Sequence, residues 1–405
     1  MRASILVITL VGTLDTSFDE TSNMKKVQFY WKIVVCISVV IMFVNIIPWM
    51  IKSDEKMEFL YFEAEIHDDF PTVENASPKI PHILHQTYKS EIIPEAYVPQ
   101  INSFLKYHPN WTYYFWSESS ARKLIAHKFP YFLNVWDGYK HPINRADALR
   151  YFVLYEYGGV YADCDMRFLR SLDNATKAFA AIIPPEPFEH SVFRLKMPLL
   201  TNNAIMLSRP KHPFFKLLID RLEATKDEPG LLEVAGPVFL QEGFLVYNNI
   251  RKKNLYTLQN HSYLNGLVPY NLQGKFKYPL HHQDNVLVPN THFFMNTLAW
   301  KFKTNEVLNL CKDIYENKLF SFFSSSKCVR SDVATLCSSE YFQSRDMWKR
   351  GCNEIVRREG RSKKDHSRFT FTEHLWHTSY EKVKRTAFDN WVDIKTVVPK
   401  AVIYN

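Results

Sequence analysis

The chain has 405 residues, of which 46% are apolar, and this is enough to bury the core of one large domain or of two small ones. Its 11 glycines are too few for a fibrous or low-complexity protein. The formal net charge is +8, but Lys and Arg are scattered along the sequence without a contiguous basic run of known type, so nucleic acid is not an expected partner.

The first distinct feature along the chain is the apolar segment at residues 33–51, IVVCISVVIMFVNIIPWMI. About 20 such residues span a bilayer, and the lysines that precede the segment favour a cytosolic N-terminus. We therefore expect a cytosolic tail at 1–32, an uncleaved transmembrane signal-anchor at 33–51 and a stem at 52–78. The alternative for the apolar segment is a buried core helix.

In this orientation, residues 79–400 form a luminal domain. The sequence contains four N-x-Ser/Thr sequons, at Asn75, Asn110, Asn174 and Asn260. Four cysteines follow in the C-terminal part, at Cys311, Cys328, Cys337 and Cys352. In an oxidising compartment they favour two disulfides, whereas the zinc site that is the alternative usually has CxxC pairs, which are missing here.

Strands and helices alternate from Lys79 onward. The apolar patterns predict strands at residues 80–84 (ending at His85-Gln86-Thr87), 111–116, 160–162, 179–183 and 204–207. They predict helices at residues 99–107, 117–127, 143–157, 214–224 and 238–247. This alternation is typical of an α/β fold with a mostly parallel sheet and flanking helices. The polar stretch at about 312–366 is expected to be an irregular insertion or lid.

The strongest chemical signal is the Asp163-Cys164-Asp165 triplet, which follows the predicted strand at 160–162. Two carboxylates one residue apart on extended chain point the same way, and hard cations such as Mn²⁺ or Mg²⁺ take oxygen ligands. Ligands of parallel sheets bind beyond the carboxyl ends of the strands, which is where this pair falls. The triplet alone also occurs by chance on solvated turns, so the prediction depends on its position after a predicted helix and strand.

The helix before that strand carries Asp147 and Arg150, which share one face because they lie three residues apart. One interpretation is a surface ion pair worth about 0.3–0.5 kcal/mol. The apolar residues on either side favour a partly buried polar pocket instead. In such a pocket both groups would suit hydrogen bonds to sugar hydroxyls.

Residues 143–172, INRADALRYFVLYEYGGVYADCDMRFLRSL, closely resemble the signature of glycosyltransferase family 32, whose sugar-binding region contains a DXD motif. Within that family the sequence is most similar to inositol phosphorylceramide mannosyltransferases. Further matching blocks lie at residues 81–87, 108–111, 115–117, 202–206, 210–213 and 236–237. The resemblance covers roughly residues 80–250 and becomes thin after Tyr263.

This resemblance implies a GT-A, Rossmann-like domain that retains the anomeric configuration. It implies that Asp147 and Arg150 contact the donor sugar, and that Asp163 and Asp165 hold a Mn²⁺ or Mg²⁺ ion and the diphosphate. A further set of residues is implied in lesser roles: His85, Gln86 and Thr87 near the nucleotide base, Asn202 and Asn203 as sugar or acceptor contacts, and His374 or His377 reaching the metal. A structural role is the alternative for the two histidines. Tyr88 stands where the family often has Trp.

The leading hypothesis is a single-pass type II Golgi membrane enzyme that transfers a hexose from a nucleotide sugar to a lipid or glycan. Mannose from GDP-mannose to an inositol phosphorylceramide-like sphingolipid is the first expectation. Transfer of galactose or N-acetylglucosamine from a UDP-sugar is the close alternative. An inactive, membrane-anchored sugar-binding protein and a phosphotransferase are the alternatives from other classes; Met166 after the second aspartate counts against the latter.

Overall fold

The computed structural model describes residues 31, 33, 34, 68–195, 197–251, 263, 264, 267–269, 275–299, 351, 352, 354, 355, 368–377 and 390–405. The chain divides into two compact units, Met1–Leu60 and Tyr61–Asn405, and the account below concerns the second. No helix among the described residues combines the length and apolarity needed to cross a bilayer. Most of the predicted anchor at 33–51 and most of the insertion at 312–366 lie outside these residues.

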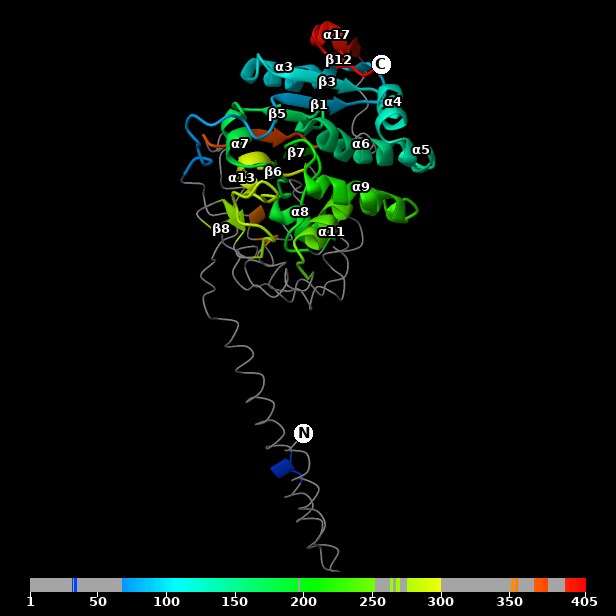
Figure 1. Cartoon of the computed structure of the whole chain (residues 1–405). Helices are drawn as coiled ribbons and strands as arrows, with labels where there is room; N and C mark the ends of the chain where they lie inside the picture. The colour runs from blue at the N-terminus through cyan, green and yellow to red at the C-terminus, as the bar shows by residue number, and fades with distance from the viewer. Residues whose placement is uncertain are drawn as a thin grey trace, which may run out of the picture. The chain divides into compact units, whose positions relative to one another are not determined.

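A six-stranded sheet, in the order β12-β3-β1-β4-β7-β6, forms the centre of the described part of the second unit (Figure 1). Its strands are β1 (Ile83–Thr87), β3 (Thr112–Trp116), β4 (Gly159–Ala162), β6 (Ala181–Ile182), β7 (Ile205–Ser208) and β12 (Val402–Ile403). The first four strands in this order, β12, β3, β1 and β4, pair in parallel, whereas β7 pairs antiparallel with both β4 and β6. The predicted α/β fold with a mostly parallel sheet is therefore confirmed, and the reversal of β7 is the part that the sequence did not reveal.

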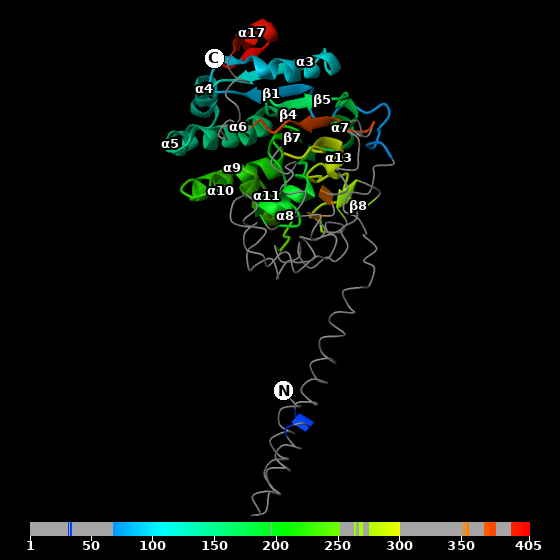
Figure 2. The same cartoon turned by 180° about the vertical axis from the view of Figure 1, so that it is seen from behind.

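Three two-stranded ladders lie outside this sheet: β10 (Thr372–His374) with β5 (Met166–Phe168), β11 (Trp391–Asp393) with β2 (Ile92–Pro94), and β8 (Tyr263–Leu264) with β9 (Val268–Pro269). All three are antiparallel. The first two join segments that are far apart in the sequence, so the C-terminal part of the chain folds back onto its beginning. Figure 2 shows this from behind, with α17 (Ile394–Val397) next to α3 (Val98–Tyr107) at one end.

Besides α3, the longer helices are α4 (Glu118–Lys128), α6 (Pro142–Tyr157), α8 (Phe188–Leu195), α9 (Pro213–Thr225) and α11 (Pro237–Tyr247). The short ones are η1 (Glu95–Tyr97), η2 (Pro130–Phe132), α5 (Leu133–Asp137), α7 (Asp173–Ala178), α10 (Leu231–Val234) and α13 (Thr291–Phe294). The five predicted helices correspond to α3, α4, α6, α9 and α11, with bounds that agree to within a residue or two, whereas α8 and the short helices were not predicted. Ser117 caps α4 as predicted, because its side chain accepts from the Ser120 N–H in a capping box.

Two glycines make the tight connection between α6 and β4. Gly158 and Gly159 have φ angles of 65° and 94°, which residues other than glycine rarely adopt. A Cβ on Gly159 would lie 2.6 Å from the carbonyl oxygen of Ile83, on the neighbouring β1. The Gly-Gly pair therefore ends the helix and lets β4 pack directly beside β1, which fixes where the next residues, Asp163 to Asp165, emerge.

Strand β1 lies further along the chain than the apolar pattern predicts. We expected residues 80–84 to be the strand and His85-Gln86-Thr87 to end it, but all three belong to β1. The reason is that the polar side chains are satisfied inside the sheet. His85 Nε2 lies 2.9 Å from the Gly158 carbonyl oxygen, and Gln86 donates to the carbonyl of Asp163 while accepting from the Tyr113 hydroxyl. Polarity thus did not mark the end of this strand.

The aromatic core includes a residue that we assigned to the stem. Phe70 is 1% exposed and makes edge-on ring contacts with Phe179, Phe293 and Phe371. Aromatic pairs of this geometry contribute beyond the area they bury. The packed part of the chain therefore begins no later than Phe70 and not near Lys79, because a lone Phe in an acidic stretch gives no periodic signal.

Candidate active site

The two aspartates of the DXD triplet lie on a tight turn at the end of β4. The strand ends at Ala162, and the Met166 N–H donates to the Asp163 carbonyl over 3.0 Å. The Asp163 N–H donates to the Ala204 carbonyl over 2.8 Å, which ties the turn to the start of β7. Our expectation of an extended chain was therefore wrong. It is the turn, and not strand alternation, that brings the two carboxylates to one place.

His374 completes a cluster with these carboxylates, which we call the Asp–Asp–His cluster (Asp163, Asp165 and His374). Strand β10 pairs with β5 so that His374 lies opposite Met166, next to Asp165. His374 Nε2 lies 3.1 Å from Asp165 Oδ1, and the His377 N–H donates to Asp165 Oδ2 over 2.7 Å. Each of the three side chains offers a ligand atom within 4.8 Å of the others.

The charges of this cluster perturb one another. Burial raises the pKa of Asp163; Arg150 partly offsets this and Asp165 adds to it. Burial alone would also raise the pKa of Asp165, but His374 and the His377 N–H hold that pKa below its ordinary value. Burial would lower the pKa of His374, but Asp165 raises it above its ordinary value. The histidine and the carboxylates therefore each favour the charged form of the other and oppose the effect of burial.

These groups fit a hard divalent cation. Carboxylate oxygens are the ligands that Mg²⁺ and Mn²⁺ prefer, and a neutral imidazole is a common further ligand. A ligating histidine must be neutral, so a bound cation would favour the neutral form of His374 and would itself compensate the two carboxylates. His377 contributes its backbone N–H to Asp165 and lies outside the group of close ligand atoms among the described residues.

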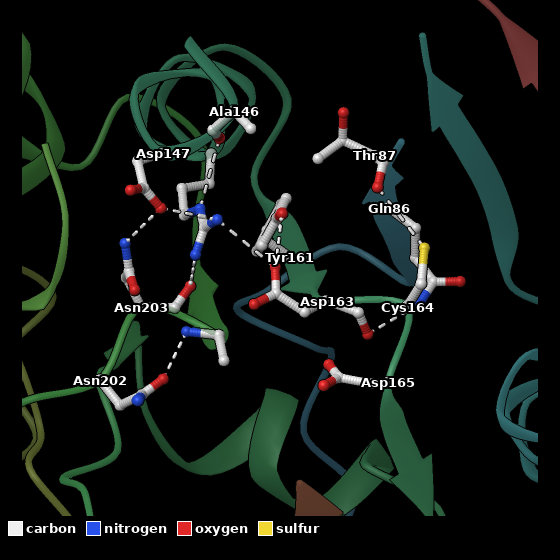
Figure 3. Close-up of polar contacts among 12 residues, drawn as sticks. Gln86, Thr87, Ala146, Asp147, Tyr161, Asp163, Cys164, Asp165, Asn202 and Asn203 are labelled. Carbon is white, nitrogen blue, oxygen red and sulfur yellow. Dashed lines mark hydrogen bonds and ion pairs between the residues drawn. The ribbon is translucent and has the colours of Figure 1, made fainter. Parts of the chain in front are cut away.

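A second set of buried polar residues faces the first, and we call it the Asp–Arg–Asn cluster (Asp147, Arg150 and Asn203). Asp147 and Arg150 are 7% and 4% exposed, so they are not a surface ion pair. The guanidinium lies 2.8 Å from Asp147 Oδ1 and donates to the Asn203 carbonyl over 2.7 Å. The Asn203 amide donates to Asp147 Oδ1 over 3.0 Å. Figure 3 shows Asp147 projecting from α6 toward Asn203.

Arg150 also connects the two clusters. Its guanidinium lies 3.4 Å from Asp163 Oδ1 and stacks 4.7 Å above the ring of Tyr161, whose hydroxyl donates to the same carboxylate over 2.8 Å. Burial raises the pKa of Asp147 to about 6, although Arg150 opposes this. The Arg150 guanidinium therefore interacts with both Asp147 and Asp163, so the positions of the three side chains depend on one another.

Both clusters line one pocket of about 490 Å³, a size typical of small-molecule sites. Its wall contains most of the residues singled out from the sequence: Thr87, Asp147, Arg150, Asp163, Asp165, Asn202, Asn203, His374 and His377. His85 and Gln86 are buried in the sheet and are not part of the wall. Gln86 acts on the site only through its hydrogen bond to the Asp163 backbone.

The C-terminal wall of the pocket has an unusual backbone. Trp376 has a φ of 58°, a conformation that is uncommon for a bulky residue and that often marks a functional site. Its ring lies 4.1 Å from that of His374, and its indole N–H donates to the Thr297 carbonyl over 2.8 Å. His374, Trp376 and His377 therefore form part of the wall, and the first and last of them are the histidines that the resemblance placed near the metal.

Sequence reasoning missed several wall residues. Glu186 and His190 precede and begin α8 without any motif, and the Glu118–Arg145 ion pair of 2.6 Å joins two helices across the pocket. Their residue types are ordinary for a surface, and only the fold brings them to the wall. No pattern in the sequence distinguishes them from the many other acids and bases of the chain.

Sequence comparison finds relatives among mannosyltransferases. The chain is 38% identical over 162 residues to mannosyl phosphorylinositol ceramide synthase SUR1 of Saccharomyces cerevisiae. The aligned region covers 40% of this chain and 39% of that protein. The chain is 36% identical over 149 residues to inositol phosphoceramide mannosyltransferase 2 of Schizosaccharomyces pombe, which covers 37% and 40%. The chain thus spans about two fifths of the length of these curated relatives.

One solved structure with a related title is the PaToxG glycosyltransferase, at 15% identity over 45% of this chain and 76% of that one. Its TM-score of 0.32 is too low to support an argument about the fold. The match to a family is more specific, because it includes α6 and the DXD turn. Residues 94–182 match the family described as glycosyltransferase sugar-binding region containing DXD motif, which confirms the resemblance that the sequence predicted.

Proposed function

We propose that this protein is a metal-dependent glycosyltransferase that moves a hexose from a nucleotide sugar to a lipid or glycan hydroxyl. The observation that carries the proposal is the meeting of the Asp–Asp–His and Asp–Arg–Asn clusters in one pocket of about 490 Å³. An inositol phosphorylceramide-like sphingolipid is the proposed acceptor and GDP-mannose the proposed donor. The names of the relatives support the mannosyl and sphingolipid parts of this assignment.

Asp163, Asp165 and His374 are the residues that would hold the Mn²⁺ or Mg²⁺ ion. When bound, such a cation neutralises charge on a diphosphate leaving group. The protein's own part is to keep the two carboxylates in place, through the turn at the end of β4 and the N–H groups that reach Asp165. Burial of the cluster strengthens each of these electrostatic contacts, because water screens them less.

Asp147 and Arg150 are proposed to orient the donor sugar. Their ion pair is fixed by Asn203 and by Tyr161, so neither side chain has to be ordered when the sugar binds. A carboxylate accepts from sugar hydroxyls and a guanidinium donates to them. The pair therefore recognises a neutral, hydroxyl-rich group next to the diphosphate.

We propose that transfer retains the anomeric configuration by a front-face route. The acceptor oxygen forms the new bond to the anomeric carbon as the bond to the diphosphate oxygen breaks. The proton of the acceptor hydroxyl passes to that departing oxygen, and the nucleoside diphosphate leaves. A covalent carboxylate intermediate is the alternative route.

The proposed location is the Golgi membrane, with a single type II span and a luminal domain. The apolar segment at 33–51 and the sequons support this assignment. Cys352, which is disulfide-bonded, is consistent with an oxidising compartment. Protease protection of the C-terminal part in intact Golgi vesicles tests it, and digestion without detergent would contradict it.

Turnover by the full chain in detergent, with Mn²⁺ and a panel of donors, tests the function directly. GDP-mannose with an inositol phosphorylceramide acceptor should give the mannosylated lipid, with the configuration of the donor retained in the product. Faster transfer from UDP-galactose or UDP-N-acetylglucosamine would reassign the donor. Binding of a sugar nucleotide without transfer to any acceptor would indicate a sugar-binding protein and contradict the enzyme.

A further inference from the structure

One carboxylate in the wall of the pocket belongs to neither cluster. Glu186 lies between β6 and α8, lines the pocket and is 3% exposed. It is not among the close ligand atoms of the Asp–Asp–His cluster. A buried acid is costly unless hydrogen bonds compensate its charge, so the contacts of Glu186 show which form it takes.

The first contact comes from Asn202. Its amide Nδ2 donates to Glu186 Oε1 over 3.0 Å. The orientation of this amide is fixed, because Asn202 Oδ1 accepts from the Ala204 N–H over 2.5 Å. The nitrogen therefore has to face Glu186, and the Glu186 oxygen has to be an acceptor.

The second contact comes from His190, one helical turn along the chain. Its Nδ1 lies 3.4 Å from Glu186 Oε2. Its Nε2 accepts from the Ala299 N–H over 3.0 Å, so the ring proton has to be on Nδ1. Glu186 therefore accepts from the Asn202 amide at one oxygen, and the His190 Nδ1 lies 3.4 Å from the other oxygen, which is too long for a strong hydrogen bond.

The position of Glu186 indicates what it can bind. Asn202 and Asn203 are consecutive: one holds Glu186 and the other holds Asp147. In Figure 3 both asparagines lie on the side of Asp147, away from Gln86 and Thr87 at the end of β1. Through Asn202, Glu186 lies beside the Asp–Arg–Asn cluster, and its charge also acts on His374 of the Asp–Asp–His cluster. A fixed negative charge repels a diphosphate, so the group that faces it has to be a neutral hydrogen-bond donor.

We propose that Glu186 accepts a hydrogen bond from a hydroxyl of the transferred hexose, with Asn202 and His190 as the residues that position it. This inference rests on the proposed function, because it takes the pocket to hold a nucleotide sugar. A carboxylate has about four acceptor positions, so it can accept from both side chains and from a hydroxyl together. Sites built to hydrogen-bond a hydroxyl discriminate strongly in its favour.

The test compares binding of GDP-mannose with binding of GDP alone, each with Mn²⁺, by calorimetry on the full chain in detergent. Glu186→Gln should weaken GDP-mannose about tenfold and leave GDP unchanged, because only the sugar reaches this wall. Glu186→Asp keeps the charge but withdraws it by one methylene. Its affinity for GDP-mannose should lie between that of the wild type and that of Glu186→Gln. The same pair of measurements with UDP-galactose and UDP covers the alternative donor.

Glu189→Gln is the matched control, since Glu189 is a fully buried acid three residues away that is not part of the pocket wall. It should leave both affinities unchanged, and thermal melting of each variant shows whether it is folded. Equal affinities of wild type and Glu186→Gln for GDP-mannose, or an equal loss for GDP, would overturn the role of Glu186 alone. Failure of the wild type to bind any of these nucleotide sugars would instead overturn the proposed function, and this inference with it.

Discussion

The two polar clusters of the pocket differ in their electrostatic design. The Asp–Asp–His cluster joins segments more than 200 residues apart and places two carboxylates together beside a histidine. The Asp–Arg–Asn cluster is centred on two residues of one helix, and its guanidinium already compensates its carboxylate. The first cluster changes its charge balance when a cation binds, whereas the second is complete without a ligand.

This difference suggests a division of labour. A site with surplus negative charge binds a cation and, through it, a diphosphate, while a self-compensated site recognises neutral hydroxyls by geometry. Arg150 contacts both clusters, so the separation is not total. Substitutions that disrupt one cluster and leave the other intact test whether the two clusters have these separate roles.

The largest effect is expected from Asp165→Asn. Losing one carboxylate of the cation site should lower turnover about 1,000-fold or more, since cation stabilisation of a leaving group is worth several kcal/mol. Folding should change little, because the side chain faces the pocket and not the core. Turnover and thermal melting check this, with Asp220→Asn on the exposed Lys216 pair as control. Normal turnover by Asp165→Asn would remove the metal role.

Arg150→Ala should affect both clusters. We expect about a 100-fold loss of kcat/KM for the donor and about 3 kcal/mol of lost stability, because Asp147 is left buried without its partner. Arg150→Lys should restore only part of either, since Lys lacks the planar set of donors.

Arg122 offers the matched control for that change. It pairs with Asp137 through two hydrogen bonds of 2.8 and 2.6 Å, but on the surface. Arg122→Ala should change stability little, because water screens this exposed pair, and it should leave donor kinetics unchanged. If urea unfolding and donor kinetics gave the same result for both arginines, the buried pair would have no special role.

His374→Gln should weaken the Asp–Asp–His cluster without removing its carboxylates. We expect Mn²⁺ affinity to fall about 10- to 100-fold, with turnover recovering as Mn²⁺ is raised. Titration of activity against Mn²⁺ measures both, and the surface variant His282→Gln is the control. A loss of turnover that excess Mn²⁺ does not relieve would place His374 outside the cation site.

The smallest effect concerns His85, a buried polar group beside the pocket but not in it. Burial lowers its pKa to about 4, although the Gly158 carbonyl opposes this. The unfolded chain therefore binds more protons below about pH 6.5, so stability falls as pH falls toward 4. Between pH 7 and pH 5 this residue should account for about 2 kcal/mol.

His85→Asn should reduce the loss of unfolding free energy between pH 7 and pH 5 by this contribution of about 2 kcal/mol. Urea unfolding of both proteins at pH 7 and pH 5 measures it. His108 and His212, whose pKa values burial lowers to about 4 and about 3, should keep the remaining slope in both. An unchanged slope would mean that His85 is accessible to water, and this would also weaken its exclusion from the pocket wall.

Local patterns in the sequence predicted five of the six strands of the central sheet and the longer helices other than α8. The apolar period of α6, the Gly158-Gly159 break and the Ser117 cap are all signals that lie within one turn or one strand. The DXD turn and the Asp147–Arg150 pair were likewise predicted as site residues, because the segment that carries them is continuous. The family resemblance extended this to Asn202 and Asn203, which the reversal of β7 places beside Asp163.

What the sequence could not predict depends on contacts between distant segments. His85 and Gln86 are polar residues inside a strand, and only their partners in β3, β4 and the Gly158 turn explain why they can be buried. Glu186 reaches the pocket because Asn202 and His190 hold it, and no periodicity reveals such a set. The resemblance proposed two histidines near the metal, and only the register of β10 against β5 distinguishes His374 from His377.

The pairing of β10 with β5 has a consequence for how the protein acquires activity. Asp163 and Asp165 are synthesised early, but the imidazole that joins them comes 209 positions after Asp165. A chain shortened before Thr372 would keep the DXD turn and the whole six-stranded sheet except β12, yet it would lack a full set of cation ligands. On the proposed function, a molecule would therefore become active only after its C-terminal part has been made and has docked.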